Sequence, residues 1–357
     1  MSTIMFTGGG SAGHVTVNQA LIPRFLDEGW KVEYIGSENG IEKSLIQPMA
    51  GVRYHSIATG KLRRYFDWRN VTDPFKVVQG VWQAYFRIKR SKPNVLFSKG
   101  GFVSVPAVIG AWLNNVPVII HESDVTPGLA NRLSIPFARS VCTTFPHTAS
   151  SLPATKACYV GPVVRAGLDQ GNADRGRALC RFTDQKPVLL IMGGSLGARS
   201  INQAVRAALP QLIRQFQIVH LCGKGQLDDT IEFSEYQQFE FMTDELTEVL
   251  AMTDIVVTRA GANSIFEFLA LSKPMLLIPL SQAQSRGDQL LNADFFEKSG
   301  YAEVLLEERL TPDMLLSSIT SLHDNRERYI RSMAQVEQSD ALSQLFDHIK
   351  QTAKALR

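Results

Sequence analysis

Short apolar runs alternate along this chain with longer stretches in which apolar residues recur at helical spacing. In the first half the runs are Ile4–Phe6, Val32–Ile35, Val95–Ser98, Val118–Ile120 and Ser140–Cys142. In the second half they are Val188–Met192, Gln217–His220, Phe239–Phe241, Ile255–Thr258 and Met275–Ile278. Such alternation is typical of parallel strands joined by crossover helices. The pattern therefore predicts the α/β class, with two doubly wound, Rossmann-like units in succession.

The length of the chain agrees with two units. A single hydrophobic core rarely serves more than about 250 to 300 residues, and this chain has 357. Between the two series of strands lies Gly161–Arg165, which is a plausible hinge. We therefore predict a first domain over residues 1–163, a second over 164–340 and a final helical segment over 341–357.

Composition and charge exclude several classes of protein. Hydrophobic residues make up 45% of the chain and charged residues 20%, as in ordinary globular proteins. The net charge of +3 is too small to indicate nucleic acid as a partner. The four cysteines form no Cys-x-x-Cys pair and are interpreted as reduced core thiols. The amino terminus lacks the features of a signal peptide, so export is not expected.

Two segments bear on membranes. The apolar passage from Phe102 to Ile120 is about as long as a membrane span, but Pro106 and Pro117 divide it into a predicted helix, turn and strand. Asp73 and Pro74 predict the start of another helix. This helix carries, at near-helical spacing, Phe75, Val78, Trp82, Tyr85 and Phe86. It is flanked by Lys61, Arg63, Arg64, Tyr65, Phe66, Trp68, Arg69, Arg87, Lys89, Arg90 and Lys92. The helix is interpreted as a core element or as a peripheral surface for an anionic membrane.

Each unit opens with a strand that runs into a glycine-rich loop and then into a helix. The first loop, Gly8 to His14, reads GGGSAGH, and the second, Gly193 to Ala198, reads GGSLGA. Glycines let backbone amides approach an anion closely, and the helix that follows presents its positive end to that anion. Two such loops predict two phosphate-bearing ligands.

The first loop also fits the dinucleotide-binding pattern G-x-G-x-x-G at Gly8, Gly10 and Gly13. That fingerprint requires an acidic residue about 20 residues further on, at the end of the second strand. Glu38 is a poorly placed candidate, and a dehydrogenase would leave the second loop unexplained. We therefore expect no nicotinamide or flavin cofactor.

His14 lies where the first loop enters its helix, and it either bonds locally or acts on a substrate. A helix amino terminus disfavours imidazolium, and a neutral imidazole beside a substrate can serve as a general base. No Asp-x-Asp pair occurs, and no histidines and carboxylates have metal-ligand spacing, so no metal is expected. A transferase would then hold its leaving diphosphate by the amides of Ser195–Ala198 and by a basic side chain such as Arg165. The second loop is thus the predicted donor site.

Two polar segments of the second half are candidates for binding the donor. Asn263–Ser264 predicts a helix start, which places Glu267 in the first turn. There its carboxylate either complements the helix dipole or binds ribose hydroxyls, and nearby Arg259 is either functional or structural. Gln289 and Asn292 share a helix face and can bind sugar hydroxyls, although such pairs are common by chance.

These segments together resemble the MurG family of glycosyltransferases. The matching motifs occur in order at residues 9–14, 36–42, 100–104, 121–131, 193–199 and 259–267 and span nearly the whole chain. The resemblance implies the GT-B fold, in which two Rossmann-like domains face each other across a cleft. It also implies that the second domain binds the donor, that the first meets acceptor and membrane, and that the last helix returns to the first domain.

The resemblance also implies an activity. The family transfers N-acetylglucosamine from UDP-N-acetylglucosamine, with inversion and without a metal, in peptidoglycan synthesis. Its acceptor is the C4 hydroxyl of the muramyl pentapeptide on undecaprenyl diphosphate, at the inner leaflet of the plasma membrane. We therefore expect a peripheral enzyme on the cytoplasmic side of the cell membrane.

Residue roles follow from the matching motifs. His14 is the candidate base, and the first loop, with Ser11 and Gly13, is expected to face the acceptor diphosphate. The expected donor ligands are Arg165 and Ser195 for the diphosphate, Glu267 for the ribose and Gln289 for the N-acetylglucosamine.

The chain departs from the family pattern at several positions. Residues 122–124 are Glu-Ser-Asp where the family usually has Glu-Gln-Asn, and Phe102 stands where it usually has tyrosine. Leu196 and Asp288 also replace common residues. The alternatives are a GT-B enzyme that acts on another lipid such as diacylglycerol, a UDP-N-acetylglucosamine 2-epimerase, and a non-catalytic binding protein.

Overall fold

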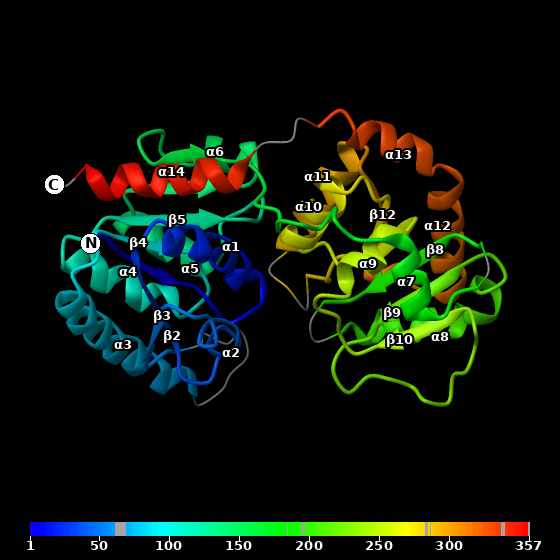
Figure 1. The fold of residues 1–357 in the computed structure, drawn as a ribbon, viewed down its shortest axis with the longest axis horizontal. Helices are drawn as coiled ribbons and strands as arrows, with labels where there is room; N and C mark the ends of the chain where they lie inside the picture. Colours follow the sequence, from blue (N-terminus) through cyan, green and yellow to red (C-terminus); the bar gives the residue numbers. More distant parts are fainter. Residues whose placement is uncertain are drawn as a thin grey trace. The chain divides into compact units, whose positions relative to one another are not determined.

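The computed structural model of the chain describes residues 1–60, 69–183, 185–194, 197–282, 285, 287–336 and 340–355, with the backbone alone at 69–74. The chain divides into two compact units. The first contains Met1–Arg165 together with Ser339–Arg357, and the second contains Ala166–Gln338. Figure 1 labels most of the helices and several strands of each unit.

The first unit is built on a seven-stranded sheet with the order β3-β2-β1-β4-β5-β6-β7, and its strand pairs are parallel. Its strands are β1 (Thr3–Thr7), β2 (Lys31–Ser37), β3 (Val52–Ile57), β4 (Val95–Ser98), β5 (Val118–Glu122), β6 (Ser140–Thr143) and β7 (Ala157–Tyr159). Its helices are α1 (Gly13–Asp27), α2 (Ile41–Ile46), α3 (Arg69–Ser91), α4 (Ser104–Leu113), α5 (Leu129–Ser134), a 3-10 turn (Ile135–Phe137), α6 (Pro146–Ser150) and α14 (Ala341–Lys354).

The second unit is built on a six-stranded sheet with the order β10-β9-β8-β11-β12-β13, again with parallel pairs. Its strands are β8 (Val188–Met192), β9 (Gln217–Leu221), β10 (Tyr236–Phe239), β11 (Ile255–Thr258), β12 (Met275–Leu277) and β13 (Ala302–Val304). Its helices are α7 (Ala173–Cys180), α8 (Arg199–Leu212), α9 (Leu246–Met252), α10 (Ala262–Ala270), α11 (Asp288–Lys298), a 3-10 turn (Glu307–Arg309), α12 (Pro312–Asp324) and α13 (Arg326–Met333).

The apolar run of β1 shows why the first sheet is covered on both faces. Ile4 and Phe6 pack into one hydrophobic core with residues of α1 and α14, whereas Met5 between them packs into another with residues of α3 and α4. Successive side chains of a strand point to opposite faces of the sheet. A continuous apolar strand is therefore buried only when helices cover both sides.

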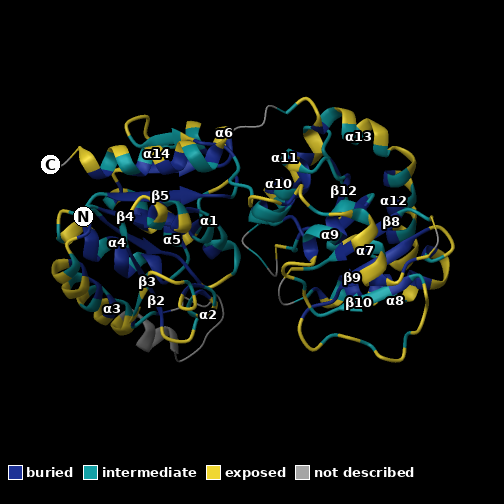
Figure 2. Ribbon diagram, viewed as in Figure 1, coloured by how far each residue is buried: buried dark blue, intermediate teal, exposed yellow. Residues whose placement is uncertain are grey.

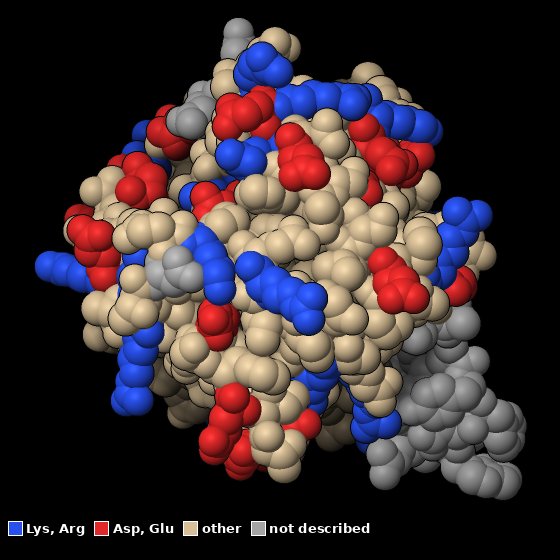
Figure 3. Space-filling view, turned by 90° about the vertical axis from the view of Figure 1, so that its right-hand side faces the viewer, with Lys and Arg blue, Asp and Glu red and all other residues tan. Residues whose placement is uncertain are grey.

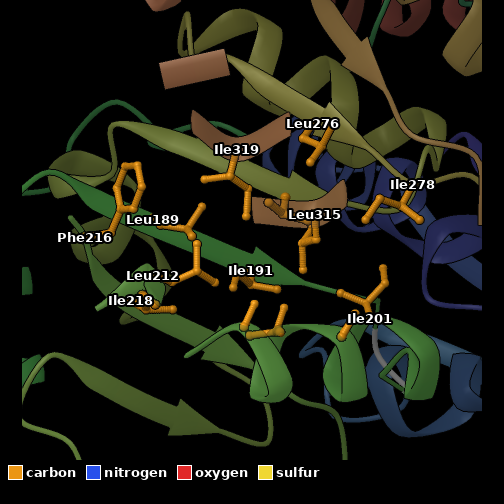
Figure 4. Close-up of a cluster of buried hydrophobic side chains, with 14 of the residues drawn as sticks. Leu189, Ile191, Ile201, Leu212, Phe216, Ile218, Leu276, Ile278, Leu315 and Ile319 are labelled. Atoms are coloured by element: carbon orange, nitrogen blue, oxygen red, sulfur yellow. The ribbon is translucent and has the colours of Figure 1, made fainter. Parts of the chain in front are cut away.

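The core of the second unit follows the same rule. Figure 4 shows Leu189 and Ile191 of β8 among the side chains that helices contribute, such as Ile201 of α8 and Leu315 and Ile319 of α12. All five of these side chains are fully buried. These buried contacts hold β8 between β9 and β11. The second glycine loop directly follows this strand.

The last helix, α14, packs on the first unit (Figure 1). Its cap Asp340 accepts a hydrogen bond from the amide of Ser343 at 3.0 Å. The ring of Phe346 lies 4.5 Å from the ring of Phe25 on α1, measured between centroids. The first unit is therefore completed by residues from both ends of the chain.

The predicted α/β class with two doubly wound units is confirmed, but several elements differ from the prediction. The strands β3, β7 and β13 are missing from it, because each forms a sheet edge and carries partly exposed residues rather than an apolar run. The strand expected at Phe239–Phe241 is misplaced, since β10 ends at Phe239 and Phe241 is exposed. The helix start at Asp73–Pro74 is wrong, because α3 begins at Arg69. Proline has a helix-compatible φ and so does not by itself mark the boundary.

The long apolar passage of the first unit is divided as predicted. It consists of α4, a turn and the first part of β5. Among the described residues, no helix combines the length and the apolar content that crossing a bilayer requires.

Candidate functional site

Both glycine loops lie where the order of strands in a sheet reverses. β1 lies between β2 and β4, and β8 lies between β9 and β11. In doubly wound sheets, ligands bind at the carboxyl ends of the strands at this switch point. Each unit therefore offers its own ligand position, directly after β1 in the first unit and directly after β8 in the second.

The first loop lies against the turn that follows β4. The amide of Gly9 donates to the carbonyl of Gly100 at 3.2 Å. A Cβ atom at Gly101, where φ is +84°, would lie 1.9 Å from the carbonyl oxygen of Gly9. Glycine is thus required at position 101 both by its backbone conformation and by the approach of the two loops.

Glu42 holds the underside of the first loop, a role that the sequence patterns do not predict. Its side chain is fully buried, and one carboxylate oxygen accepts a hydrogen bond from the amide of Gly10 at 3.1 Å. The other oxygen accepts from the amide of Ser37 at 2.9 Å and from its hydroxyl at 2.5 Å. An anionic ligand of this loop must therefore use groups beyond Gly10, because that amide is already bonded to a carboxylate.

The ring of His14 is oriented by the loop that precedes it. His14 is the second residue of α1, and its Nδ1 lies 3.0 Å from the hydroxyl oxygen of Ser11 and 3.0 Å from the carbonyl oxygen of Gly9. A carbonyl oxygen only accepts, so the bond to Gly9 places the proton on Nδ1. The lone pair is then on Nε2, which suits that atom for accepting a proton. Gly13 is the first residue of the same helix, whose N-cap Ala12 makes no side-chain capping bond.

Lys99 is a buried lysine beside this loop and is also absent from the sequence-based predictions. It directly follows β4 and is 2% exposed, and its Nζ donates to the hydroxyl of Ser123 at 2.6 Å. Burial lowers the pKa of Lys99, whereas the carboxylates of Glu122 and Asp124 act in the opposite direction. Two positions that depart from the family pattern, Ser123 and Asp124, thus surround a lysine. A buried strand followed by a lysine at a glycine turn was the signal available in the sequence.

Glu122 fixes the segment that carries these two departures. One of its carboxylate oxygens accepts from the side-chain amide of Asn131 at 2.8 Å and from the backbone amide of Gly128 at 2.9 Å. The other accepts from the backbone amide of Asp124 at 3.0 Å. Glu122 is 4% exposed, so these bonds make it a structural anchor for the turn between β5 and α5.

A cavity of about 760 Å³ lies in the first unit next to the first loop. It is lined by Ser37, Glu38, Asn39, Gly40, Ser56, Ile57, Ala58, Thr59, Lys76, Gln79, Gln83 and Phe102. Phe102 connects this cavity to the loop, because a Cβ atom at Gly10 would lie 2.6 Å from its ring. Most of the lining is polar, so the cavity suits a ligand with hydroxyl or amide groups.

The second loop shows the same backbone requirements as the first. Gly194 has a φ of +96° and Gly197 a φ of +75°. A Cβ atom at Gly197 would lie 2.0 Å from the carbonyl oxygen of Cys222. Ser195 and Leu196, between these glycines, lie outside the described residues. The helix after the loop, α8, begins at Arg199, and its N-cap Ala198 makes no side-chain capping bond.

Glu267 lies in α10, but not where the sequence pattern predicts. The helix begins at Ala262 with Gly261 as its N-cap, so Glu267 is its sixth residue and belongs to the second turn. The expectation of a first-turn carboxylate is wrong, because Asn263 and Ser264 lie inside the helix rather than at its cap. The dipole effect fades after the first turn, so dipole compensation no longer accounts for this half-buried carboxylate.

Arg259 is held by partners within the protein. Its guanidinium lies 2.5 Å from a carboxylate oxygen of Glu307, and the two side chains are 9% and 8% exposed. It also donates to the carbonyl oxygen of Ile278 at 3.1 Å and to the hydroxyl of Ser200 at 3.2 Å. Of the two interpretations of Arg259, the structure supports the structural one.

The two polar residues of α11, Gln289 and Asn292, make different contacts. Asn292 is fully buried and donates to the carbonyl oxygen of Ala260 at 3.0 Å, so it does not join a sugar-binding face. Gln289 is half-buried and accepts a hydrogen bond from the amide of Leu280 at 3.1 Å. Of the two residues, Gln289 therefore remains the candidate for binding a sugar.

The predicted site residues fall into two groups. Ser11, Gly13 and His14 come together at the first loop, whereas Glu267 and Gln289 lie in the second unit. Arg165 is exposed and is the last residue of the first unit before the chain enters the second.

On the face drawn in Figure 3, basic and acidic side chains are interspersed rather than gathered by sign.

Comparison with known proteins yields matches over both units. The model of the glycosyltransferase family 28 N-terminal domain matches residues 4–143, and that of the family 28 C-terminal domain matches residues 188–351. The chain is 57% identical over 352 residues to the UDP-N-acetylglucosamine–N-acetylmuramyl-(pentapeptide) pyrophosphoryl-undecaprenol N-acetylglucosamine transferase of Geobacillus thermodenitrificans (strain NG80-2), covering 98% of this chain and 99% of that protein. It is 52% identical over 354 residues to transferase 3 of the same name from Bacillus cereus (strain ATCC 14579), covering 99% of both.

Solved structures share the architecture. The crystal structure of Acinetobacter baumannii MurG superposes with a TM-score of 0.77 at 25% identity, over 98% of this chain and 99% of that one. The calicheamicin glycosyltransferase CalG4 superposes with a TM-score of 0.72 at 14% identity, over 99% and 98% of the two chains. The second of these similarities shows the fold alone.

Proposed function

Because this chain belongs to glycosyltransferase family 28, we propose that it transfers N-acetylglucosamine from UDP-N-acetylglucosamine to the muramyl pentapeptide carried on undecaprenyl diphosphate. The observation that carries this function is the 57% identity to a transferase of that name over 98% of the chain. The resemblance to the MurG family and the GT-B class of fold are confirmed. The chain is an N-acetylglucosaminyltransferase.

The proposed reaction is a single displacement at the anomeric carbon of the donor sugar. The C4 hydroxyl oxygen of the acceptor forms a bond to that carbon while the bond from the carbon to UDP breaks. UDP leaves with the bonding electron pair, and attack from the opposite side inverts the carbon. The hydroxyl proton must pass to a base, and we assign that base to Nε2 of His14, because the bond from Nδ1 to Gly9 leaves the lone pair there.

The acceptor is proposed to bind in the first unit. Its diphosphate would interact with Ser11 and with the amino terminus of α1 from Gly13 onward, where the helix dipole favours an anion. This placement agrees with the bond between Glu42 and the amide of Gly10, which directs an anion past that residue. The polar cavity beside Phe102 is then available to the sugar and peptide portions of the acceptor.

The donor is proposed to bind in the second unit. Ser195 and the amides of the second loop would hold the diphosphate together with Arg165, Glu267 would bind the ribose, and Gln289 the N-acetylglucosamine. Amides and the α8 dipole neutralise part of the leaving charge, so we propose that the transfer needs no divalent metal. The support for this assignment is the position of the loop after β8, at the switch point of its sheet.

An acceptor-dependence assay tests the function. Purified protein and UDP-N-acetylglucosamine are combined with the undecaprenyl-linked muramyl pentapeptide or with diacylglycerol, and UDP release is followed with and without a chelator. We expect release with the muramyl lipid in both conditions. Release with diacylglycerol alone would establish the alternative lipid acceptor, and conversion of the sugar nucleotide without any acceptor would indicate an epimerase. Loss of activity in chelator would contradict metal independence.

A lipid-linked acceptor requires a surface that meets the membrane, and we propose that α3 provides it. The helix buries a face of small and apolar residues, Gly80, Ala84 and Ile88, against its own unit. Its opposite side exposes Phe75, Val78, Trp82 and Phe86, each by more than half. Figure 2 shows this exposed side of α3. The flanking residues Lys61 to Trp68 lie outside the described residues.

Basic side chains accompany these apolar ones. Lys76, Arg87, Lys89 and Arg90 of α3 are all exposed. Exposed aromatic residues with a basic border are typical of helices that lie in an anionic lipid interface, and each basic side chain contributes about 1 kcal/mol near such a surface. We therefore propose a peripheral location on the cytoplasmic side of the cell membrane, at its inner leaflet.

Replacing both Trp82 and Phe86 with serine should weaken binding to anionic vesicles by roughly 10-fold or more, because each large apolar side chain contributes about 1.5–3 kcal/mol when buried in lipid. Vesicle sedimentation measures this, with neutral vesicles and added salt to separate the charge contribution. The matched control is Phe241→Ser, which removes a side chain that is 62% exposed in the second unit. Equal vesicle binding by the two variants would contradict the proposal that α3 contacts the membrane.

A further inference from the structure

Cys142 and Cys158 face each other across the edge of the first sheet. They are direct partners in the parallel pairing of β6 and β7, and both are free thiols. Directly paired residues of neighbouring strands point to the same face of a sheet. Cys142 is fully buried, while Cys158 is only half-buried, so the pair can be reached from one side.

A histidine from the far end of the chain completes this cluster. One ring nitrogen of His348 on α14 and the sulfur atoms of Cys142 and Cys158 all lie within 4.8 Å of one another. His348 is placed there by α14, whose Leu345 and Ile349 pack into the same hydrophobic core as Cys142. Three soft or borderline ligands therefore converge where the last helix meets the sheet.

A hydrogen bond orients the histidine ring. Nε2 of His348 lies 2.8 Å from the hydroxyl oxygen of Ser140, which is two residues before Cys142 on β6 and therefore on the same face of the strand. Ser140 therefore holds the ring of His348 in place beside the two sulfur atoms.

We propose that Cys142, Cys158 and His348 form a binding site for a thiophilic divalent cation such as Zn²⁺, which fastens α14 to the edge of the first sheet. Two thiolates and an imidazole are a ligand set that Zn²⁺ binds in tetrahedral geometry, with a water or other small ligand in the fourth position. In that geometry sulfur ligands at about 2.3 Å from the metal are about 3.8 Å apart. The separations in the cluster therefore require only a small contraction.

The charge of the cluster is compatible with this assignment. A metal binds cysteine as the thiolate and histidine as the neutral imidazole, so binding would release the thiol protons to solvent. Two thiolates would balance the two charges of the cation, so the bound site would bury no net charge.

Cobalt binding tests the proposal directly. Reduced, metal-free protein is titrated with Co²⁺, and the thiolate-to-cobalt charge-transfer band is recorded in the ultraviolet. We expect one equivalent to bind, Zn²⁺ to displace the cobalt, and Zn²⁺ at about 100 times its Kd to raise the unfolding temperature by several degrees. Wild-type protein without this band would overturn the proposal. If the band is absent, loss of two hydrogen atoms in mass after exposure of the protein to air would identify a Cys142–Cys158 pair that forms a disulfide with oxygen as oxidant instead.

Variants assign the ligands. Cys158→Ser and His348→Gln should each abolish the band and the Zn²⁺-dependent gain in unfolding temperature. Both residues are only half-buried, so these variants are expected to fold. The matched control is Cys180→Ser, which removes a buried thiol of the second unit and should keep the band. An unchanged band in His348→Gln would overturn the three-ligand site.

The same variants separate this site from the transfer reaction. None of its ligands belongs to the glycine loops, so Cys158→Ser should retain transferase activity with and without chelator. Loss of activity in chelator by both proteins would contradict the metal independence of the transfer, whereas the cobalt titration decides the cluster. Loss of activity in Cys158→Ser without chelator would contradict the separation of this cluster from the transfer reaction.

Discussion

Replacing His14 with alanine should lower the turnover number for N-acetylglucosamine transfer by about 10²- to 10⁴-fold, the usual contribution of a positioned general base. The affinity for UDP-N-acetylglucosamine should change little, because the donor is proposed to bind in the other unit. Steady-state UDP release measures turnover, and isothermal titration measures donor binding. His14 would leave the mechanism if the variant kept full turnover.

The shape of the pH profile separates a base from a residue that only supports its loop. The rate of the wild type should fall toward acid as Nε2 of His14 becomes protonated, and this acidic limb should be absent from the residual activity of His14→Ala. If His14 only held the loop in place through its Nδ1 bond to Gly9, His14→Ala would lower the rate but would keep the acidic limb of the profile. The matched control is His147→Ala, which removes an exposed histidine of α6 and should preserve both rate and profile.

Replacing Arg259 with methionine should destabilise the second unit by about 3–5 kcal/mol, because it leaves the carboxylate of Glu307 buried without its counter-charge. All four tryptophans precede residue 166, so their fluorescence reports only the first unit. Urea unfolding followed by circular dichroism should show an earlier transition for the second unit. The tryptophan transition should remain in place.

Two further variants show whether this loss comes from the ion pair. Adding Glu307→Gln to Arg259→Met removes the unpaired charge while keeping an oxygen acceptor, and it should restore more than half of the lost stability. Lys298→Met breaks the exposed pair with Asp294, whose side chains are 74% and 52% exposed, and should cost less than about 0.5 kcal/mol. Similar losses from Arg259→Met and Lys298→Met would contradict the structural role of Arg259.

The ion pair also predicts a pH dependence. Burial raises the pKa of Glu307, but hydrogen bonds from Arg259 and Ser200 outweigh burial and hold that pKa below its ordinary value. A lowered pKa contributes stability above the ordinary value that is lost as the pH falls through the lowered one. The wild type and Arg259→Met should therefore converge in stability as the solution becomes acidic.

Much of the fold was predictable because it depends on neighbours in the sequence. The apolar runs of the central strands, such as Ile4–Phe6 and Val188–Met192, indicate burial on both faces and hence parallel sheets covered by helices. The edge strands β3, β7 and β13 were not predictable in this way, since an edge position lets polar and exposed residues enter a strand. Whether a strand is central depends on the whole sheet.

The site divides along the same line. The glycine patterns indicate the positions of both loops. The contact between Ser11 and His14 is also local, because the two residues are three positions apart in the first loop. Sequence spacing shows Glu267 and Arg259 only as members of a motif. The turn of α10 that holds Glu267 and the partner that holds Arg259 depend on where a helix begins and on Glu307, which is distant in the chain.

The order of residues along the chain is enough to predict two doubly wound units, a glycine loop after the first strand of each, and a basic aromatic helix in the first unit. Three features depend on the folded chain: α3 exposes its aromatic residues, Glu42 accepts a hydrogen bond from the amide of Gly10, and His348 lies beside Cys142 and Cys158. Periodicity and loop chemistry act between residues a few positions apart. Exposure, charge pairing and ligand clusters depend on side chains that only folding brings together.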